Sequence, residues 1–295
     1  MSTIKSYAVG NGDTFYIDHN SDNFTIIDCH LPDEHRATIL NNLKRLVADK
    51  GIVRFISTHP DEDHLKGLKA LDEKLNLRNF YCVKNATTKS DETEDFKHYC
   101  TLRDSSVAFH IKKGCSRRWM NLSDEERKTS GLQVLWPDLA NNDFRAALKD
   151  AEGGGSPNNI SAIITYAVQD CARFMWLGDL ETDYMEAIAD EVDWPKVHIL
   201  FAAHHGRLSG RVPHVILDKI KPDIIILGEA PSRHLHYYGG YNTITQNTAG
   251  DITFECLDNK VHVFVSAETY YPSHLKWLPE YASLHGDTYI GSLVI

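Results

Sequence analysis

Short apolar segments recur along the chain at the length of a β-strand, separated by polar stretches. Apolar runs of roughly four to eight residues between turn residues are typical of buried strands. Such runs occupy residues 24–28, 52–57, 132–136, 160–168, 173–179, 197–203, 223–228, 252–257 and 261–266.

Helical patterns lie between several of these segments. Over residues 35–51, Ile39 and Leu43 fall on one face, and Gly51 provides a stop signal. Residues 181–192 and 212–220 read as two further helices. The order of strands and helices predicts a layered α/β protein in which helices flank packed sheets.

Residues 83–131 interrupt this rhythm with a polar and charged composition. We interpret them as an insertion or lid within a single domain that spans residues 1–295. Within this segment, Lys112, Lys113, Arg117 and Arg118 lie close to Trp119. Such a cluster either tracks phosphates, with the ring stacking on a base, or is a solvated surface.

Composition narrows the class of protein. The chain is 42% hydrophobic and 24% charged, which is ordinary for a globular protein. Its 31 Lys and Arg against 41 Asp and Glu give a net charge of −10, which argues against a broad nucleic-acid-binding face but leaves room for a local basic groove. The six cysteines lack CxxC spacing and are expected to be free thiols.

No membrane segment is expected. No apolar run approaches the roughly 18 residues needed to span a bilayer, and the first residues lack a basic segment followed by an apolar one. We therefore expect a cytoplasmic protein without membrane association.

The stretch THPDEDH, residues 58–64, places four potential metal ligands directly after an apolar run. An acidic turn that only caps the next helix would explain one aspartate and neither histidine. His59, Asp61, Asp63 and His64 offer the imidazole nitrogens and carboxylate oxygens that Zn²⁺ or Mn²⁺ accepts. The pattern predicts a metal site at a strand end.

This stretch resembles the HxHxDH signature of the metallo-β-lactamase fold hydrolases. Two later motifs are similar to that family: FMWLGDLE with Asp179, and FAAHHG with His204 and His205. The opening VGNGDTFYI and FTIIDCH looks like the family's first hairpin, in which Asp28 buttresses the site. The resemblance implies an αββα sandwich and a metal-dependent hydrolase.

Together with SPNNISAIITY at 156–166, the set resembles one subgroup, the nuclease-like domain of competence DNA-uptake channels (ComEC type). The matches run from residue 7 to about residue 265. The channel's membrane segments are absent from this sequence, so a role in DNA import does not carry over.

The resemblance implies a role for each motif residue. A first ion would be held by His59 and Asp61, and a second by Asp63, His64 and His205, with Asp179 bridging them. His204 would orient a ligand or transfer a proton. A metal-bound hydroxide would be the nucleophile, and Asp63 could also accept the proton of the water.

The sequence also departs from the family pattern. Asp61 stands where most members have a second histidine, and Asn158 or Asn159 falls where many have a third. Oxygen-rich coordination favours Mn²⁺ or Mg²⁺ over tight Zn²⁺ binding. Two divalent ions are expected, although a single-metal enzyme or one that binds without catalysis also fits.

Four residues are candidates for substrate contact. Asn158 and Asn159 either hydrogen-bond substrate oxygens or build a turn, as asparagine often does near Pro and Gly. Arg207 and Arg211 follow the HHG motif, where a guanidinium suits a phosphate. The loop 231–241, rich in His and Tyr, either lines the same cleft or packs against the core.

Three functions remain open. The first is a phosphodiesterase or nuclease acting on nucleic acid or a nucleotide, with an unidentified protein partner an open question. The second is a metallohydrolase of a small ester, thioester or lactam. The third is a catalytically lapsed protein that binds a nucleotide or partner. The sequence leaves the oligomeric state open.

Overall fold

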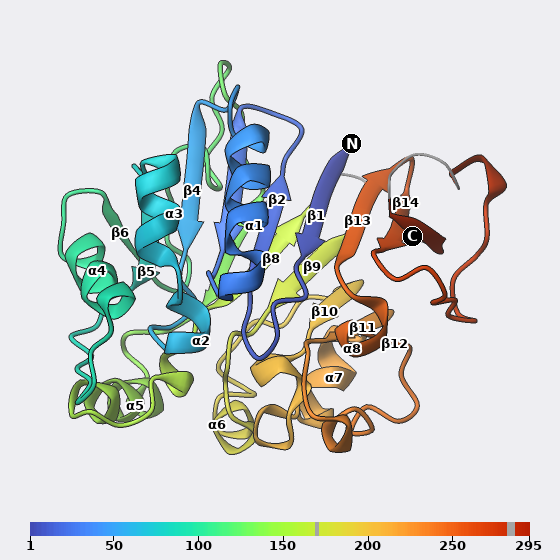
Figure 1. The fold of residues 1–295 in the computed structure, drawn as a ribbon. Helices are drawn as coiled ribbons and strands as arrows, with labels where there is room; N and C mark the ends of the chain where they lie inside the picture. Colours follow the sequence, from blue (N-terminus) through green and yellow to red (C-terminus); the bar gives the residue numbers. More distant parts are fainter. Residues whose placement is uncertain (169–170, 282–286) are drawn as a thin grey trace.

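A computed structural model describes residues 1–168, 171–281 and 287–295. Its strands form two sheets (Figure 1). The larger sheet has nine strands: β1 (Ser2–Ser6), β2 (Phe15–Asp18), β3 (Asn23–Ile27), β4 (Ile52–Ile56), β5 (Phe80–Val83), β6 (Ala108–Ile111), β13 (Ile252–Leu257), β14 (Lys260–Val265) and β15 (Thr288–Val294). Their spatial order is β15-β14-β13-β1-β2-β3-β4-β5-β6.

The smaller sheet has six strands in the order β12-β11-β10-β9-β8-β7. These strands are β7 (Leu132–Trp136), β8 (Ile163–Ala167), β9 (Arg173–Trp176), β10 (Ile199–Phe201), β11 (Ile224–Leu227) and β12 (Thr243–Thr245).

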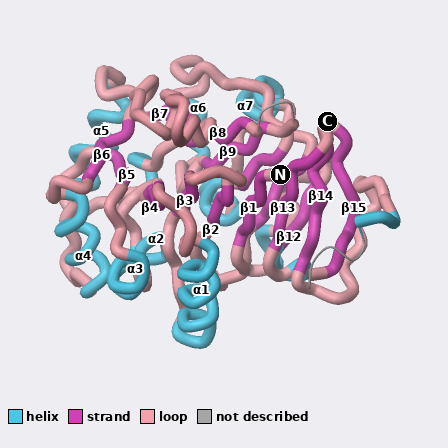
Figure 2. The backbone as a smooth tube through the Cα atoms, turned by 90° about the horizontal axis from the view of Figure 1, so that it is seen from above, coloured by secondary structure: helices cyan, strands magenta, loops and turns pink. Residues whose placement is uncertain are grey.

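Helices cover the outer faces of both sheets. They are α1 (Asp33–Leu46), α2 (Glu62–Leu65), α3 (Leu68–Leu75), α4 (Glu94–Arg103), α5 (Asn142–Glu152), α6 (Thr182–Ala187), α7 (His214–Ile220) and α8 (Gln246–Ala249), with the 3₁₀ turns η1 (Asn158–Ile160), η2 (Ala203–Gly206), η3 (Leu208–Gly210), η4 (Ser232–His234) and η5 (Pro279–Tyr281). Seen from above, α1, α3 and α4 lie on one side of the strands, and α6 and α7 lie on the other (Figure 2).

The two sheets pack face to face through aromatic side chains. The ring of Phe15 in the larger sheet lies 6.1 Å from Trp176 and 4.9 Å from Phe201 in the smaller one. Phe254 meets Phe174 at 5.7 Å. Edge-to-face aromatic pairs of this kind stabilise a core beyond the area that they bury. The structure therefore confirms the αββα sandwich expected from the sequence.

A second apolar cluster fixes the helices on the larger sheet. It joins the outward face of that sheet, including Phe24 and Phe55, to Leu43 of α1, Leu68 of α3 and Phe96 of α4. The face of α1 that the sequence pattern predicted is the buried one, since Ile39, Leu40 and Leu43 are buried.

Each apolar run predicted as a strand contains one, and the three predicted helices correspond to α1, α6 and α7. α6 is shorter than the predicted range 181–192, because Ile188 ends it. Residues 83–131 contribute α4 and β6. β6 is the edge strand of the larger sheet on the side opposite β15. Within the described ranges, the helices are all too short or too polar to cross a bilayer.

The arrangement of strands determines where a site can form. β3 runs parallel to β4, and β9 runs parallel to β10, so the loops that follow these strands gather at one edge of each sheet. β2 is antiparallel to β3, with Phe15 opposite Ile27, so the loop before β2 reaches the same edge. The loops after β3, β4, β9 and β10 and the loop between β1 and β2 therefore meet between the sheets.

Candidate metal centre

The loop after β4 turns sharply into a short helix. Asp61 caps α2, its carboxylate accepting a hydrogen bond from the backbone N–H of Glu62 at 2.9 Å. His59 precedes this cap, while Asp63 and His64 lie in the first turn of the helix. One strand end thus holds all four motif residues on a short, hydrogen-bonded turn.

Asp28 fixes the orientation of His64. It follows β3 with a left-handed φ of 56°, and its side chain is 1% exposed. Its carboxylate accepts hydrogen bonds from Thr58 N at 2.8 Å and Thr58 Oγ1 at 2.6 Å, and lies 2.9 Å from His64 Nδ1. A carboxylate on Nδ1 leaves Nε2 of the same ring as the free ligand atom.

Asp13 takes the same position behind His205. It lies in the loop between β1 and β2, with Oδ1 at 3.3 Å from His205 Nδ1. The backbone N–H of Asp13 donates to the carbonyl of Asp63 at 3.1 Å, which ties this loop to the motif. Asp13 is not among the ligands predicted from the sequence motifs. Its position follows from the pairing of β2 with β3, because the loop before β2 must lie beside the end of β3.

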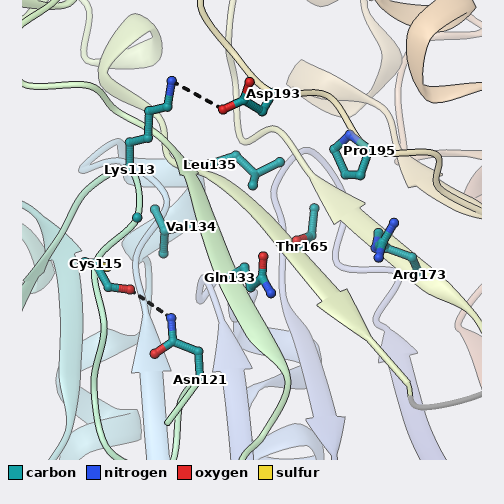
Figure 3. Close-up of a pocket in the computed structure, with 11 residues that line it drawn as sticks. Lys113, Cys115, Asn121, Gln133, Val134, Leu135, Thr165, Arg173, Asp193 and Pro195 are labelled. Carbon is teal, nitrogen blue, oxygen red and sulfur yellow. Dashed lines mark hydrogen bonds and ion pairs between the residues drawn. The ribbon is translucent and has the colours of Figure 1, made fainter.

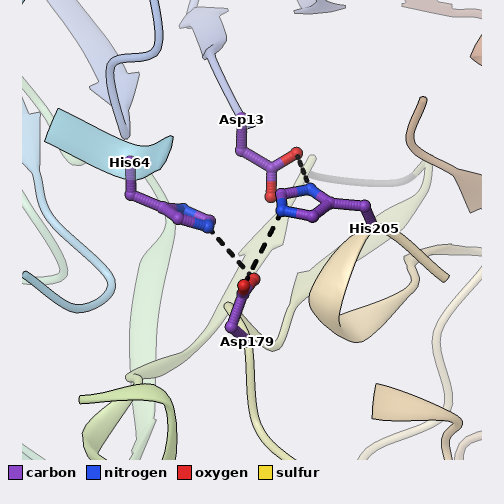
Figure 4. Close-up of side chains that lie close together, drawn as sticks. All are labelled: Asp13, His64, Asp179 and His205. Atoms are coloured by element: carbon purple, nitrogen blue, oxygen red, sulfur yellow. Dashed lines mark ion pairs between the residues drawn. The ribbon is translucent and has the colours of Figure 1, made fainter. Parts of the chain in front are cut away.

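The two imidazoles converge on Asp179 from opposite sides (Figure 4). His64 Nε2 is 3.1 Å from Asp179 Oδ1, and His205 Nε2 is 3.7 Å from Asp179 Oδ2. Asp63 Oδ2 is 3.5 Å from His205 Nε2. Asp13, His64, Asp179 and His205 each offer a ligand atom within 4.8 Å of the others. Because Asp13 approaches Nδ1 and not Nε2, we assign it to orientation of His205, and Asp63 to the ligand set.

His59 and His204 lie beside this group. The rings of His59 and His64 are 4.2 Å apart, and His204 Nε2 is 3.7 Å from Asp179 Oδ2. Both His204 and His205 adopt left-handed backbone conformations, with φ of 51° and 56°. Two consecutive non-glycine residues in this region are energetically costly and cluster at functional sites.

Several buried nitrogen atoms of these rings have no hydrogen-bond partner. They are His59 Nε2, His64 Nε2 and both ring nitrogens of His205, together with Asp179 Oδ1. The short distances from His64 Nε2 to Asp179 and from His205 Nδ1 to Asp13 are ion-pair distances without hydrogen-bond geometry. Burying polar atoms without a hydrogen-bond partner costs free energy, so a cluster of such atoms indicates a bound group that would satisfy them. Imidazole nitrogens and carboxylate oxygens that converge without satisfying one another fit a divalent cation.

The electrostatics of the group agree with this assignment. Burial alone would lower the pKa of His205, but Asp13 and Asp179 raise it to about 10. Burial likewise opposes the raised pKa of His64, which Asp179 and Asp28 hold well above its usual value. The carboxylates therefore stabilise positive charge at this point. A bound cation would be stabilised in the same way, and its binding would release the protons.

Asp61 has other partners. Lys89 Nζ, from the loop before α4, lies 2.5 Å from Asp61 Oδ1. Burial would raise the pKa of Asp61, but the hydrogen bond and charge of Lys89 lower it. The carboxylate thus binds an ammonium and a backbone N–H.

The two asparagines have different environments. Asn159 donates to Glu181 Oε2 at 2.9 Å and accepts from Glu181 N at 3.0 Å, so its amide holds the loops after β9 and before β8 together. Asn158 is 8% exposed, and its Oδ1 has no hydrogen-bond partner. Of the pair, Asn158 is the one with a free polar atom.

The two arginines after the HHG motif also differ. Arg211 Nη2 lies 3.1 Å from His214 Nε2 on α7. Arg207 is close enough to His204 and His234 for its charge to lower the pKa of both, after burial, which is the larger cause. Within the described ranges, its guanidinium has no hydrogen bond or ion pair.

The basic segment around Trp119 forms structural contacts. The guanidinium of Arg117 stacks on Tyr81 and Phe109 at 4.9 and 4.7 Å, and Trp119 donates to Asp124 at 2.6 Å. Lys113 lines a groove of about 360 Å³, where it pairs with Asp193 at 3.7 Å (Figure 3). No residue of the metal centre lines this groove.

Comparison with known proteins adds information on fold alone. No family model and no curated protein matches the chain. Similar solved structures include Igni18, a novel metallo hydrolase from Ignicoccus hospitalis, with 13% identity, a TM-score of 0.49, and coverage of 86% of this chain and 99% of that one. CmlA, a diiron β-hydroxylase from Streptomyces venezuelae, has 14% identity, a TM-score of 0.44, and coverage of 77% and 44%.

A B3 metallo-β-lactamase with an active-site glutamic acid is also similar, with 16% identity, a TM-score of 0.34, and coverage of 59% of this chain and 62% of that one. These structures do not bear on the ComEC-type resemblance, which stays a prediction. At such low identities and TM-scores, the chemistry has to be argued from the side chains of this chain.

Proposed function

We propose that this protein is a metal-dependent hydrolase that cleaves a phosphodiester in a nucleic acid or nucleotide. The observation that carries metal dependence is the convergence of unsatisfied His64, His205 and Asp179 atoms, each ring backed by a carboxylate. The observation that favours a phosphate substrate is Arg207, three residues after His204 in the chain, whose guanidinium has no anionic partner in the described part of the chain. Guanidinium groups suit phosphate oxygens.

One group of residues would bind the metal ion, and another would bind the substrate. His64, His205, Asp63 and Asp179 would hold the ion, for which this mixture of nitrogen and oxygen donors suits Mn²⁺ or Zn²⁺. A bound ion of this kind lowers the pKa of water and polarises the bond to be broken. Asp63 is the most exposed of the four, at 22%, and so is placed to accept a proton from the attacking water.

His204 and Arg207 would act on the substrate. Ser209 Oγ lies 3.0 Å from His204 Nδ1, which fixes the ring. Burial lowers the pKa of His204, so the ring is held neutral and can accept a proton at the reacting phosphate. Arg207 would bind the non-bridging oxygens, and Asn158 Oδ1 remains free to accept a hydrogen bond from the substrate.

The proposal predicts activity that depends on metal and on the type of ester. Protein stripped with a chelator is expected to be inactive, and Mn²⁺ should restore cleavage of bis-p-nitrophenyl phosphate and of single-stranded or double-stranded DNA or RNA. The assay compares these rates with those for p-nitrophenyl acetate and a chromogenic lactam. Full activity after chelation would contradict metal dependence, and turnover of the acetate or lactam alone would favour the ester or lactam alternative.

A second prediction concerns Arg207. Arg207→Gln is expected to raise KM for bis-p-nitrophenyl phosphate by about tenfold to a hundredfold, since a hydrogen bond to a charged group is worth about 1.5–3 kcal/mol. Any turnover of p-nitrophenyl acetate should stay unchanged. Arg78→Gln, an exposed arginine between α3 and β5, is the matched control. Equal effects of both substitutions would remove Arg207 from the substrate site.

A further inference from the structure

The position of Asp61 determines how many ions this centre can hold. A second ion beside the first would need ligands from His59, Asp61, His204 and the second oxygen of Asp179. His59 offers a buried Nε2 without a hydrogen-bond partner, and His204 Nε2 lies 3.7 Å from Asp179 Oδ2. Three of the four ligands are therefore present, and Asp61 decides whether the set is complete.

The carboxylate of Asp61 is already bound by two donors. Its Oδ1 accepts from the backbone N–H of Glu62 at 2.9 Å and lies 2.5 Å from Lys89 Nζ. A charge-assisted hydrogen bond of this length is among the stronger ones in proteins. A divalent cation on this carboxylate would have to displace the ammonium or bind the other oxygen, Oδ2, directly beside it, against the repulsion of like charges.

The fold holds the ammonium of Lys89 in this place. The side chain of Lys89 is only 17% exposed, and its Nζ lies over the ring of Phe96 on α4 at 5.2 Å. The start of α4 is tied to the motif, since Thr93 Oγ1 donates to Glu62 Oε2 at 2.8 Å. Asp95 accepts from the backbone N–H of Gly67 at 2.7 Å. Segment 84–95 is thus anchored next to α2.

We propose that the ammonium of Lys89 takes the place of a second metal ion, so that the chain binds one divalent cation through His64, His205, Asp63 and Asp179. This inference rests on the metal centre of the proposed function, and it replaces the expectation of two ions. Lys89 supplies positive charge at Asp61, the carboxylate to which the resemblance gives a share in a first ion.

The test counts bound ions without any substrate. Chelator-stripped wild type, Lys89→Met, Lys89→Arg and Lys84→Met are titrated with Mn²⁺ and, separately, Zn²⁺, and the ions per chain are counted by native mass spectrometry and elemental analysis. Lys84 is an exposed lysine of the same segment and serves as the matched control. Thermal melting shows that each variant is folded.

We expect about one ion per chain in wild type, Lys89→Arg and Lys84→Met, and a second ion in Lys89→Met, where Asp61 is released to act as a ligand. Asp61→Asn in the wild-type background should leave the single ion in place. Two ions in wild type, one ion in folded Lys89→Met, or loss of the ion in Asp61→Asn would each overturn the inference. Because no substrate is used, these outcomes are independent of whether a phosphodiester is cleaved.

Discussion

Asp179→Asn is expected to abolish metal binding and hydrolysis while leaving the fold intact. Asp179 faces the Nε2 atoms of three histidines, at 3.1 Å from His64 and 3.7 Å from both His204 and His205. Asparagine keeps the size of the side chain but offers one neutral oxygen where the carboxylate offers two charged ones. We expect metal affinity to fall by at least about a hundredfold, because replacing even a group behind a ligand costs about 10–100-fold.

Three measurements on the Asp179→Asn variant separate chemistry from folding. Isothermal titration with Mn²⁺ gives the affinity, the bis-p-nitrophenyl phosphate assay gives the rate, and thermal melting in excess chelator gives the stability without metal. Asp183→Asn, at an exposed position in α6, should behave as wild type in all three. If the Asp179 variant bound Mn²⁺ as tightly as the Asp183 variant, the assignment of the centre would be wrong.

The apolar runs in the sequence located nine of the described strands and missed six, of which β1, β2 and β5 lie inside the larger sheet and β6, β12 and β15 at sheet edges. β11 is a continuous apolar run, and β4 is apolar apart from the buried Arg54, because both faces of each strand are covered. β6 and β12, at opposite ends of the two sheets, have four and three residues and are only partly buried. No periodicity develops over so few positions, so their strand character depends on the neighbours with which they pair.

The site likewise combines residues that are close together in the sequence with residues that only the fold brings together. His59, Asp61, Asp63 and His64 are readable because one turn holds them together. Asp13 became visible only through the register of the first hairpin, which places it beside residues about fifty positions later in the chain. Spacing along a chain gives the type of ligand, but the partner of each ligand depends on tertiary contacts.

Lys89 shows a contact that the motif itself does not contain. The family resemblance implies that Asp61 is a metal ligand. The structure adds an ammonium from a segment 28 residues further along the chain, within hydrogen-bond distance of the same carboxylate. No local pattern around residue 89 predicts this contact, because it depends on how segment 84–95 packs on α2.

Asp28→Ala is expected to cause the largest loss of stability among single changes at this site. Its carboxylate, 1% exposed, is the partner of Thr58 N, Thr58 Oγ1 and His64 Nδ1. Alanine would leave three buried donors without an acceptor, and alanine at a φ of 56° adds about 1–2 kcal/mol of backbone strain. We expect the free energy of unfolding to fall by about 3–5 kcal/mol, as when one partner of a buried charged pair is removed.

Two comparison variants make this prediction specific. Asp28→Asn keeps an acceptor oxygen and tolerates the left-handed backbone, so its loss should be smaller, about 1–3 kcal/mol. Asp33→Ala removes a carboxylate that is 80% exposed and pairs only with Arg36 on the surface of α1, and it should cost less than about 1 kcal/mol. Urea unfolding in excess chelator measures all three without a contribution from bound metal. Equal losses for Asp28→Ala and Asp33→Ala would mean that Asp28 does not hold the site together. Removing a buried acceptor of three donors should destabilise the protein much more than removing a surface carboxylate.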